Sequence, residues 1–335
     1  MIIRLVVRRM IALVLVLLGI SLLTFFLSHV VPADPVRLYA GPRASPATIA
    51  FLRHQFGFDR PIWEQYLTYA GGLLHGNFGY SLFSHRPVAN DLADYLPATF
   101  ELTLTSILLI LGIGIPLGIV AAVWRGSVID HAARVLSATG IAMPAFWLGL
   151  MVQLVFFDIL GWFPAGGRLD ATTAPPPHVT GLYTVDSLLA GNLWLFWQSV
   201  WHLILPATVL AYGSLAVITR QMRGSMREIL PQDYVRTARA KGLMPRVVVL
   251  RHAFKNALLP VITIAGLQIG ILLGGALLVE DVFLWPGIGR YATLATINLD
   301  YNAILAVTLV AAVIYVVANL IVDILYIVVD PTVTY

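Results

Sequence analysis

The sequence predicts an all-α integral membrane protein with about six transmembrane helices, and three observations support this fold class. Of the 335 residues, 59% are hydrophobic and only 11% are charged, whereas soluble domains contain about 25% charged residues. The apolar residues form continuous runs close to the ~20 residues that cross the hydrocarbon core of a bilayer. Such runs exclude a transmembrane β-barrel, whose strands alternate in polarity and are about 10 residues long.

The first apolar run follows three arginines and is longer than the apolar core of a secretory signal, so we expect an uncleaved helix. Proline is tolerated inside transmembrane helices because neighbouring groups satisfy the freed backbone, and Pro144 and Pro206 therefore do not exclude a span. The six predicted spans are Met10–Val31, Pro97–Trp124, Arg134–Phe157, His202–Ile218, Leu258–Val279 and Ala303–Val329.

These spans divide the chain into three parts. Residues 1–31 form an N-terminal tail and the first helix, and residues 32–95 form a proline-broken extracytoplasmic segment with two short helices. Residues 96–335 form a core of five transmembrane helices that includes a long cytoplasmic loop, residues 220–257.

The basic residues predict the orientation. If the N-terminus is cytoplasmic, residues 1–9, 125–134 and 220–257 contain 14 of the 21 Lys and Arg, although the outer segments are longer. Lys and Arg accumulate on the cytoplasmic side of membrane proteins. The sequence therefore predicts that both termini are inside.

Several classes of site are absent from the sequence. The chain has no cysteine, which excludes disulfides and thiolate chemistry. It has no G-x-x-x-x-G-K-[ST] phosphate loop, no metal-binding motif such as H-E-x-x-H and no catalytic triad pattern, and the glycines of residues 285–290 predict a turn. We expect no enzyme activity and no metal or cofactor in this chain, and nucleic acid is not an expected partner because there is no basic stripe interleaved with aromatics.

The cytoplasmic loop contains signals for a short helix of about ten residues. Pro231 is at a favoured first-turn position, and Asp233 suits the positive end of the helix dipole. Gly242 is placed to end the helix as a left-handed cap. The alternative is a loop that only sets topology through its charge, but topology requires neither a proline start nor a glycine stop.

The faces of this short helix suggest a contact with another protein. Tyr234 and Ala238 are four residues apart and share one face. The small side chains of Ala238 and Ala240 would let the groove of another protein approach the backbone closely. A rigid helix of this kind between two spans would act as a lever.

The segment DYVRTARAKGL followed by LRHAFKNALLP resembles the cytoplasmic EAA loop of ABC importer permeases. It is most similar to the B-type subunit of the dipeptide/oligopeptide/nickel permease family. Further blocks in the same order, among them FGFDRPIWEQYLTYAGGLLHGNFGYS, MPAFWLGLMVQLVF and GGALLVEDVFLWPGIGR, extend the similarity over nearly the whole chain. The Glu-Ala-Ala triplet is replaced here by Arg236, Thr237 and Ala238, while Gly242 keeps its place.

The resemblance implies a type I ABC importer permease bundle in a bacterial or archaeal cytoplasmic membrane. It implies di- or oligopeptides as substrates, with nickel or another small solute as the alternative cargo. It implies a second homologous permease, two ABC ATPase subunits that bind ATP and Mg²⁺, and an extracytoplasmic binding protein docked on residues 32–95 and 158–200. The loop helix would be the coupling helix that seats in the ATPase, and its residues are Asp233, Tyr234, Arg236, Thr237, Ala238, Arg239, Ala240, Lys241 and Gly242.

Small and polar residues also recur inside the predicted spans. Gly266, Gly270 and Gly274 form one smooth face, which favours close helix packing over the alternative that they line the pathway. Gln268, the one strongly polar residue of that helix, is a candidate for substrate contact.

Carboxylates inside spans are costly unless they have a partner. Asn319 and Asp323 share a face, and for Asp323 we expect a structural ion pair with a loop arginine rather than a proton relay. Glu101 is expected to reach the headgroup region, without a special role.

Two other functions are conceivable. A secondary transporter or channel that works alone would need charged or polar groups near the midplane for coupling ions, and these spans contain almost none. A membrane enzyme would need a convergent set of His, Asp, Glu or Ser at the end of a span, and none is found.

Overall fold

The protein is helical throughout the part of the chain that the computed structural model describes, residues 2–30, 35–41, 44–55 and 57–329. Val31, the predicted end of the first span, and Arg43 lie outside these residues. Within the described ranges the structure has no strand, only one isolated bridge between Tyr80 and Pro87. The all-α prediction is therefore confirmed.

Five helical stretches are long and apolar enough to cross a membrane, and a bent helix pair would be the sixth. The spanning elements are α1 (Ile2–Val30), α5 (Val88–Leu109) with the π-helical turn η1 (Ile110–Gly114) and α6 (Ile115–Val123), α7 (Val128–Ala142) with α8 (Ala145–Gln153), α10 (Leu193–Ile229), α13 (Phe254–Val282) and α15 (Tyr301–Val329). Each predicted span thus has a counterpart.

The third span differs from the straight helix that we predicted. The axes of α7 and of α8, which continues as the π-helical turn η2 (Leu154–Ile159), meet at 110° around Pro144. Met143, the residue before Pro144, has an extended backbone (φ −86°, ψ 125°) because proline disfavours the α conformation of its predecessor, and Pro144 itself cannot donate a helical hydrogen bond. Pro206 lies inside α10 without such a break.

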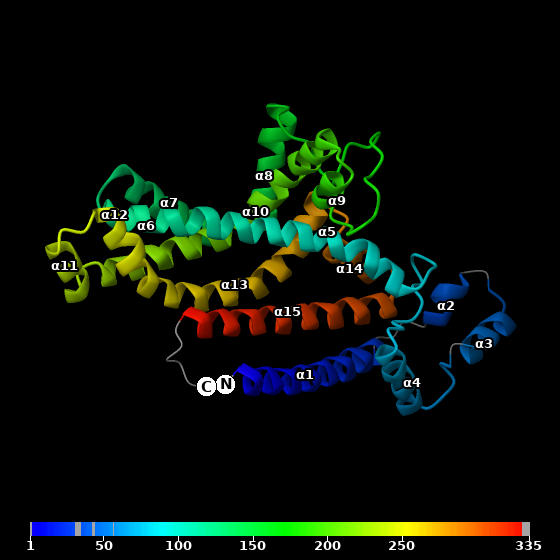
Figure 1. The fold of residues 1–335 in the computed structure, drawn as a ribbon. Coiled ribbons are helices and arrows are strands. Elements are labelled where there is room, and N and C mark those ends of the chain that lie inside the picture. Colours follow the sequence, from blue (N-terminus) through cyan, green and yellow to red (C-terminus); the bar gives the residue numbers. More distant parts are fainter. Residues whose placement is uncertain (1, 31–34, 42–43, 56, 330–335) are drawn as a thin grey trace.

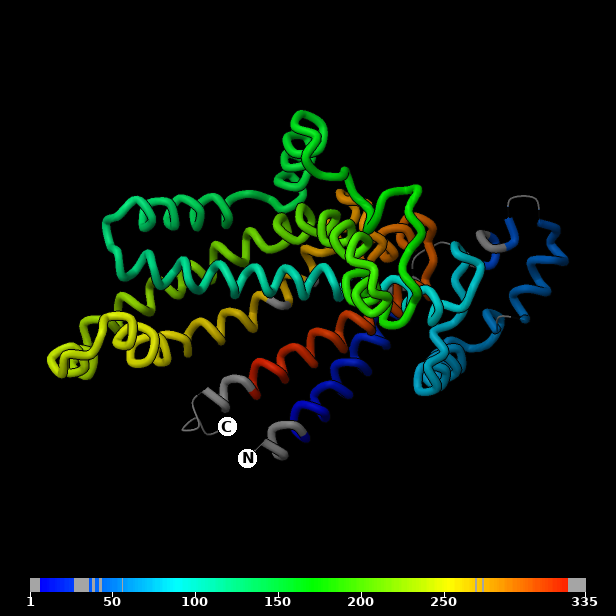
Figure 2. Tube along the Cα trace, turned by 45° about the horizontal axis from the view of Figure 1, so that its top comes forward, coloured from blue at the N-terminus to red at the C-terminus, as the bar shows by residue number. Residues whose placement is uncertain are grey.

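Shorter helices join these spans. They are α2 (Pro35–Ala40), α3 (Pro46–Gln55), α4 (Ile62–Leu74), α9 (Tyr183–Leu189), α11 (Asp233–Ala240), α12 (Pro245–Val247) with the π-helical turn η3 (Val248–Ala253), and α14 (Ile288–Ile297). Figure 1 shows α11 and α12 at one end of the bundle and α2, α3 and α4 at the other. α1 and α15 run side by side, which Figure 2 shows from a second direction.

Helix α10 is the centre of the core. It contacts α5, α6, α7, α8, α9 and α13, and its buried residues extend from Leu195 to Met226. Close approach to its neighbours depends on glycine, because a Cβ at Gly140 would lie 2.5 Å from the Cβ of Ala216 and one at Gly118 would lie 2.8 Å from the carbonyl oxygen of Thr219. The helices α6, α7 and α10 therefore form one tightly packed unit.

A second, smaller core lies at the extracytoplasmic end. Its buried residues come from the start of α5, from α14 and from the start of α15, including Val88, Tyr291 and Ala303. The division of the chain into residues 1–31, 32–95 and 96–335 stays a prediction.

Candidate functional site

The helix predicted in the cytoplasmic loop is present as α11, which begins at Asp233, the first residue of the predicted coupling set. It ends at Ala240, two residues earlier than the predicted helix, and Gly242 follows with φ +74°, which confirms the left-handed glycine. Pro231 lies in the turn before the helix rather than in its first turn, and Gln232 is the N-cap residue. The short connections on both sides keep α11 close to the ends of α10 and α13.

The inner face of α11 is part of the hydrophobic core of this chain. Val235 and Ala238 are 0% and 5% exposed and belong to the same buried cluster as Met226 and Val248. The expectation that Ala238 opens the helix to another protein is therefore wrong, because this small side chain lets α11 approach its own bundle.

The tyrosine of α11 helps to hold it in place. Its hydroxyl accepts a hydrogen bond of 2.7 Å from Nδ2 of Asn256, at the start of α13. Tyr234 is partly exposed, unlike Ala238, so the two residues do not form one uniform outer surface.

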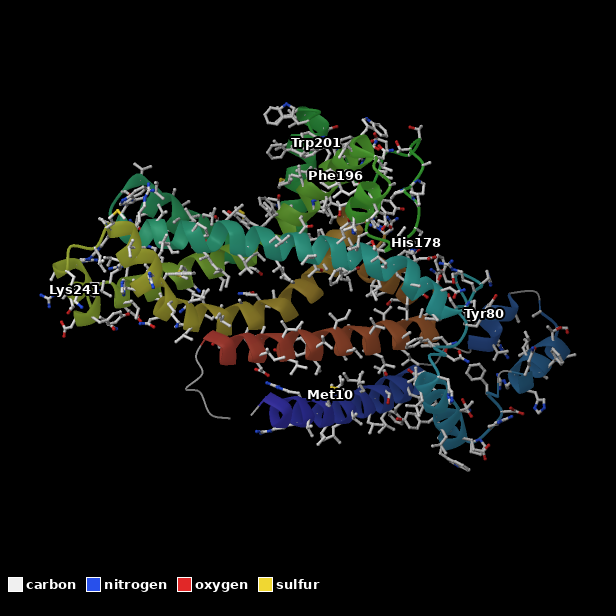
Figure 3. All side chains as sticks on the ribbon, viewed as in Figure 1. Met10, Tyr80, His178, Phe196, Trp201 and Lys241 are labelled. Atoms are coloured by element: carbon white, nitrogen blue, oxygen red, sulfur yellow. The ribbon has the colours of Figure 1, made fainter. Side chains whose placement is uncertain are left out.

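The outer face of α11 and the residues after it are free in this chain. Figure 3 shows Lys241 at the far end of the bundle. An intrahelical pair between Arg236 and Asp233, at 3.4 Å, joins two exposed side chains. The exposed members of the predicted coupling set are Asp233, Tyr234, Arg236, Thr237, Arg239, Ala240, Lys241 and Gly242.

A buried carboxylate that the sequence analysis missed fixes the cytoplasmic end of α10. Asp130, 1% exposed, accepts hydrogen bonds from Nε of Arg223 at 2.6 Å and from the backbone N–H of Gly126 at 3.0 Å. Ser127 caps α7 by accepting a 3.2 Å hydrogen bond from the backbone N–H of Asp130. The S-x-x-D spacing resembles a capping box and is the sequence signal that marks this helix start.

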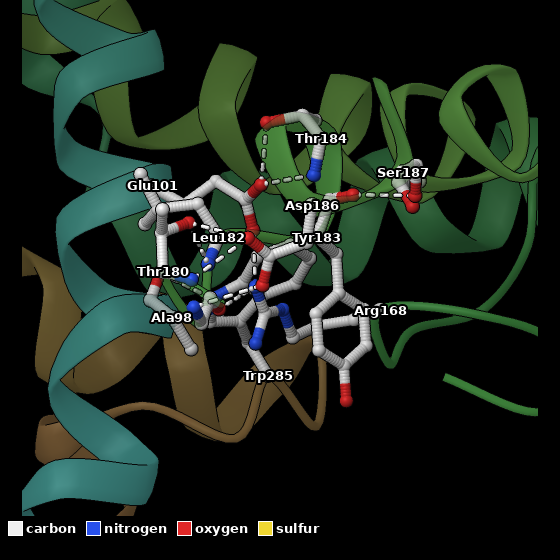
Figure 4. A network of polar contacts seen from close by, with 12 residues as sticks. Ala98, Glu101, Arg168, Thr180, Leu182, Tyr183, Thr184, Asp186, Ser187 and Trp285 are labelled. Atoms are coloured by element: carbon white, nitrogen blue, oxygen red, sulfur yellow. Dashed lines mark hydrogen bonds and ion pairs between the residues drawn. The ribbon is translucent and has the colours of Figure 1, made fainter. Parts of the chain in front are cut away.

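Further buried charges lie at the extracytoplasmic end, where Figure 4 shows a polar network around Arg168. Its guanidinium donates to Glu101 at 2.6 Å and to the carbonyl oxygen of Gly181 at 2.8 Å, and it lies 3.5 Å above the ring of Tyr183. Thr184 donates to Glu101 through its backbone N–H and its hydroxyl. Glu101 is 4% exposed, so the expectation that it reaches the headgroup region is wrong.

The same network orders the loop before α9. Burial by itself raises the pKa of the Asp186 carboxyl, but hydrogen bonds from Thr180, Gly181 and Val179 outweigh it, so that the pKa lies below its usual value. This carboxylate therefore stays ionised at neutral pH and holds the loop around it. We call Glu101, Arg168, Thr184 and Asp186 the outer clasp.

The predicted turn at residues 285–290 encloses another carboxylate. Glu280 is fully buried and accepts hydrogen bonds from the Thr99 hydroxyl at 2.6 Å and from the backbone N–H of Arg290 at 3.1 Å. A Cβ at Gly287 would overlap the Glu280 carboxylate. Only residues 285–287 of the predicted turn are outside a helix, because α14 starts at Ile288. Gly287, which has no side chain, allows the backbone to approach the Glu280 carboxylate closely.

Two further carboxylates brace the loop before α5. Asp300 accepts hydrogen bonds from the Ser81 hydroxyl at 2.5 Å and from the backbone N–H of Phe83 at 3.1 Å. Asp91 accepts one from the hydroxyl of Tyr291 at 2.8 Å and is paired with Arg86. These residues fix the loop to α14 and α15.

The candidate pathway residues of α13 have different neighbours. A Cβ at Gly266 would lie 2.7 Å from Val322 and one at Gly270 would lie 2.7 Å from Tyr315, so both glycines face α15, whereas the corresponding position at Gly274 is open. Gln268 is buried and accepts a 3.3 Å hydrogen bond from the hydroxyl of Ser214. This arrangement favours packing as the role of Gly266 and Gly270.

The polar pair of the last span lies near the first helix. Asp323 forms an ion pair of 2.5 Å with Arg9, which lies on α1 rather than in a loop as we expected. Asn319 donates to the carbonyl oxygen of Tyr315 within its own helix. Among the described residues no group of three or more His, Cys, Asp or Glu is arranged to hold a metal ion.

Comparison with known proteins assigns these features to a family. Residues 114–335 match the family model described as "Binding-protein-dependent transport system inner membrane component", and residues 2–103 match the model of the N-terminal part of such membrane components. The chain is 48% identical to the "Probable D,D-dipeptide transport system permease protein" of Escherichia coli K12, over 95% of this chain and 94% of the relative.

Two other relatives are similar over almost their full length. One is a di/tripeptide transport system permease protein of Pseudomonas aeruginosa, 43% identical over 98% of both chains. The other is a glutathione transport system permease protein of Escherichia coli K12, 38% identical over 98% of both chains. The names of these relatives refer to D,D-dipeptides, to di- and tripeptides and to glutathione.

Proposed function

Because the chain belongs to the binding-protein-dependent transport system inner membrane component family, we propose that it moves di- or oligopeptides through the bacterial cytoplasmic membrane as one permease subunit of an ABC importer. The relatives that it matches along their full length are named for peptide cargo. The other functions considered, a stand-alone secondary transporter or channel and a membrane enzyme, are not favoured, because members of this family work with a binding protein.

The observation that carries this proposal is the exposed outer face of α11. Its inner face is packed into the core through Val235 and Ala238, while Arg236, Arg239 and Ala240 point away from the bundle. A helix of eight residues that is rigidly attached on one side and uncovered on the other is suited to transmit a displacement. The outer face of α11 would seat in the cleft of a separate ATPase subunit.

The partners of the chain follow from this assignment. A substrate-binding protein and ATPase subunits act with the family; we assign two ATPase subunits, which bind ATP and Mg²⁺, and a second homologous permease that completes the pathway. This chain would carry no cofactor. Residues 32–95 and 158–200 would receive the binding protein on the extracytoplasmic side.

The free energy for transport would come from the different affinity of ATP for two states of the assembly. Closure of the ATPase subunits would displace α11, which is joined to α10 at Ile229 and to α13 through η3. Because α6, α7 and α10 pack as one unit, the displacement would move these helices together. Substrate would then reach the inner side only in one of the two states.

A bulky substitution on the outer face of α11 tests this function. Ala240→Trp should abolish peptide uptake in proteoliposomes that contain the complete importer, because the indole occupies the space needed by the ATPase. The fold should survive, since Ala240 is exposed in this chain. Ala132→Trp, at another exposed alanine, near the cytoplasmic start of α7 and outside α11, is the matched control and should leave uptake unchanged. Normal uptake by Ala240→Trp would contradict the proposal.

A further inference from the structure

A cavity of about 480 Å³ lies at the extracytoplasmic end of the molecule, beside the smaller core. Its walls come from the outer end of α1, from α4 and the turn before it, from residues 77–82 and from the start of α15. The volume falls within the range of about 300–1,000 Å³ that is usual for small-ligand sites. The motion proposed for α11 does not involve this cavity, which lies at the opposite end of the bundle.

The cavity lies at the depth where the hydrocarbon core of the membrane ends. Phe25 lines it from α1, whose apolar span ends at Phe26, and Tyr301 lines it from α15, where the last span begins. Leu22 and Phe26, beside Phe25 on α1, are 53% and 60% exposed. Figure 1 shows α4 at this end of α1, and Trp63 of α4 is exposed. Because tryptophan and tyrosine accumulate at the level of lipid headgroups, we place the cavity at the outer headgroup region.

Two buried hydroxyl groups in the cavity wall make no hydrogen bond within the chain. The hydroxyl oxygens of Tyr69, on α4, and Tyr301, on α15, are shielded from solvent and have no partner among the described residues. Burial, and to a smaller extent the neighbouring Tyr66, raises the pKa of the Tyr69 hydroxyl, which therefore stays a neutral donor. A buried polar group without a partner destabilises the folded state. Both hydroxyls therefore favour a ligand that brings hydrogen-bond acceptors.

The charge of the wall indicates an anionic ligand. Arg60 lines the cavity with an exposed side chain and forms no ion pair with another described residue, and the adjacent Asp59 is paired with His54 at 2.6 Å. The described lining contains no Asp, Glu, Lys or His. A guanidinium and two hydroxyl donors suit the oxygens of a phosphate, and the apolar lining, such as Phe25 and Leu305, suits a hydrocarbon chain.

The position of the cavity favours a lipid over the cargo. Helix α1, which forms one wall, packs mainly against α15, whereas the centre of the bundle is α10. A ligand in this cavity therefore lies at the periphery of the bundle, next to the exposed side chains of α1. A phospholipid reaches such a position from the bilayer, and it brings both the phosphate and the apolar chains that the wall accommodates.

We propose that this cavity binds the headgroup of an anionic phospholipid of the outer leaflet, whose phosphate accepts hydrogen bonds from Tyr69 and Tyr301 and faces Arg60. The acyl chains leave the cavity along Phe25 and the outward side of α1. Helix α4 rests on α1 through the rings of Tyr66 and Tyr69 against Phe25, and the bound headgroup also joins α4 to α15. This inference depends neither on the cargo nor on the ATPase.

Native mass spectrometry of the full-length protein, purified in detergent with the subunits that accompany it, tests this site. Phosphatidylglycerol is titrated in, and phosphatidylcholine with the same acyl chains is the zwitterionic comparison. The site should retain one phosphatidylglycerol, about tenfold more tightly than phosphatidylcholine. Tyr69→Phe, Tyr301→Phe and Arg60→Gln should each weaken this binding about tenfold, because a hydrogen bond to a charged group contributes a decade or more in affinity.

Two matched variants control for indirect effects. Tyr66→Phe removes a hydroxyl on the same helix that already has a partner, Oγ of Ser21 at 2.9 Å. Arg53→Gln removes an exposed arginine of the same segment that does not line the cavity. Both should bind phosphatidylglycerol as the unmodified protein does.

Thermal unfolding gives a second readout. Phosphatidylglycerol should raise the melting temperature of the unmodified protein and of the Tyr66→Phe and Arg53→Gln controls. It should not raise that of the double variant Tyr69→Phe with Tyr301→Phe. The double variant should still fold, because phenylalanine keeps the ring of Tyr69 packed against Phe25.

Four results would overturn the inference. Equal retention of the two lipids would show an unselective lipid surface, and phosphatidylglycerol binding that all three cavity variants leave unchanged would place the lipid elsewhere. Displacement of the lipid by an equal concentration of inorganic phosphate would assign the cavity to a free anion. Displacement by dialanine would assign it to a peptide carboxylate.

Discussion

The outer clasp and helix α11, at opposite ends of the molecule, use charge in opposite ways. At the extracytoplasmic end, Arg168 and Glu101 are paired with side chains only 6% and 4% exposed, inside a network of hydrogen bonds. At the cytoplasmic end, Arg236 and Asp233 form a pair with side chains 72% and 97% exposed. Buried pairs fix a structure because an unpaired buried charge is strongly unfavourable, whereas exposed pairs contribute little.

The comparison suggests a division of labour between the two ends. The outer clasp and the carboxylates Asp91, Glu280 and Asp300 hold the extracytoplasmic loops in one arrangement. The outer face of α11 has no such network within this chain, and its charges are available to a partner. The extracytoplasmic loops are thus stabilised within this chain, whereas we propose that the outer face of α11 is completed by another subunit.

The largest effect is expected for Arg168→Ala at the outer clasp. It leaves the Glu101 carboxylate buried without its cation, which should lower the free energy of unfolding by about 3–5 kcal/mol. Thermal unfolding of the purified subunit in detergent measures this. The double substitution Glu101→Leu with Arg168→Met removes both charges and should lose less. Equal losses for the single and double variants would show that the clasp does not depend on charge pairing.

At the cytoplasmic end, Asp130→Ala should cost about 1–3 kcal/mol, because it leaves the groups that donate to this buried carboxylate without an acceptor. It should also reduce the peptide transported per ATP hydrolysed, since the end of α10 that carries α11 loses its attachment to α7. Asp130→Asn keeps an acceptor oxygen and should restore part of both quantities. A normal transport ratio in a destabilised Asp130→Ala variant would separate stability from coupling.

The packing between the two ends can be tested with Gly140→Ala. The added methyl group lies too close to Ala216 and should destabilise the protein by about 1–3 kcal/mol through overpacking. Gly224→Ala is the control on α10, where a Cβ meets nothing within 4 Å, and it should be neutral or stabilising. Thermal unfolding of both variants gives the difference, and equal melting temperatures would argue against a rigid connecting unit.

The smallest effect is expected for Asp323→Asn. The pair with Arg9 is partly exposed, with side chains 41% and 16% accessible, so its loss should cost about 0–1 kcal/mol. Peptide uptake in vesicles should be unchanged, as for a structural ion pair. A loss of uptake with normal stability would instead indicate that Asp323 relays protons.

Local signals in the sequence predicted the elements that depend on local physics. The apolar runs predicted the spans, and Asp233 and Gly242 predicted the position of α11 within two residues. The bend was not predictable in this way, because Pro144 breaks a span and Pro206 does not. After the bend α8 packs against α13, whereas α10 is continuous and packs against α5, α6, α7 and α13, and such contacts between segments remote in the sequence leave no local signal.

The outer clasp was missed for the same reason. Glu101 meets Arg168 and Thr184 across 67 and 83 residues, and nothing next to Glu101 in the chain indicates either partner. The sequence analysis therefore treated it as a carboxylate near the membrane surface. Of the candidate residues, Ala238 was assigned to the wrong side of α11, because spacing alone defines a face but not the protein that covers it.

The most direct test of the central claim, that α11 transmits force from a separate ATPase, leaves the packed residues Val235 and Ala238 unchanged. Arg236, Arg239 and Lys241 are replaced by glutamate, and peptide uptake and ATP hydrolysis are measured in the same proteoliposomes. We predict that uptake falls to the level of vesicles without importer and that loaded binding protein no longer stimulates hydrolysis. Undiminished uptake with stimulated hydrolysis would contradict the account.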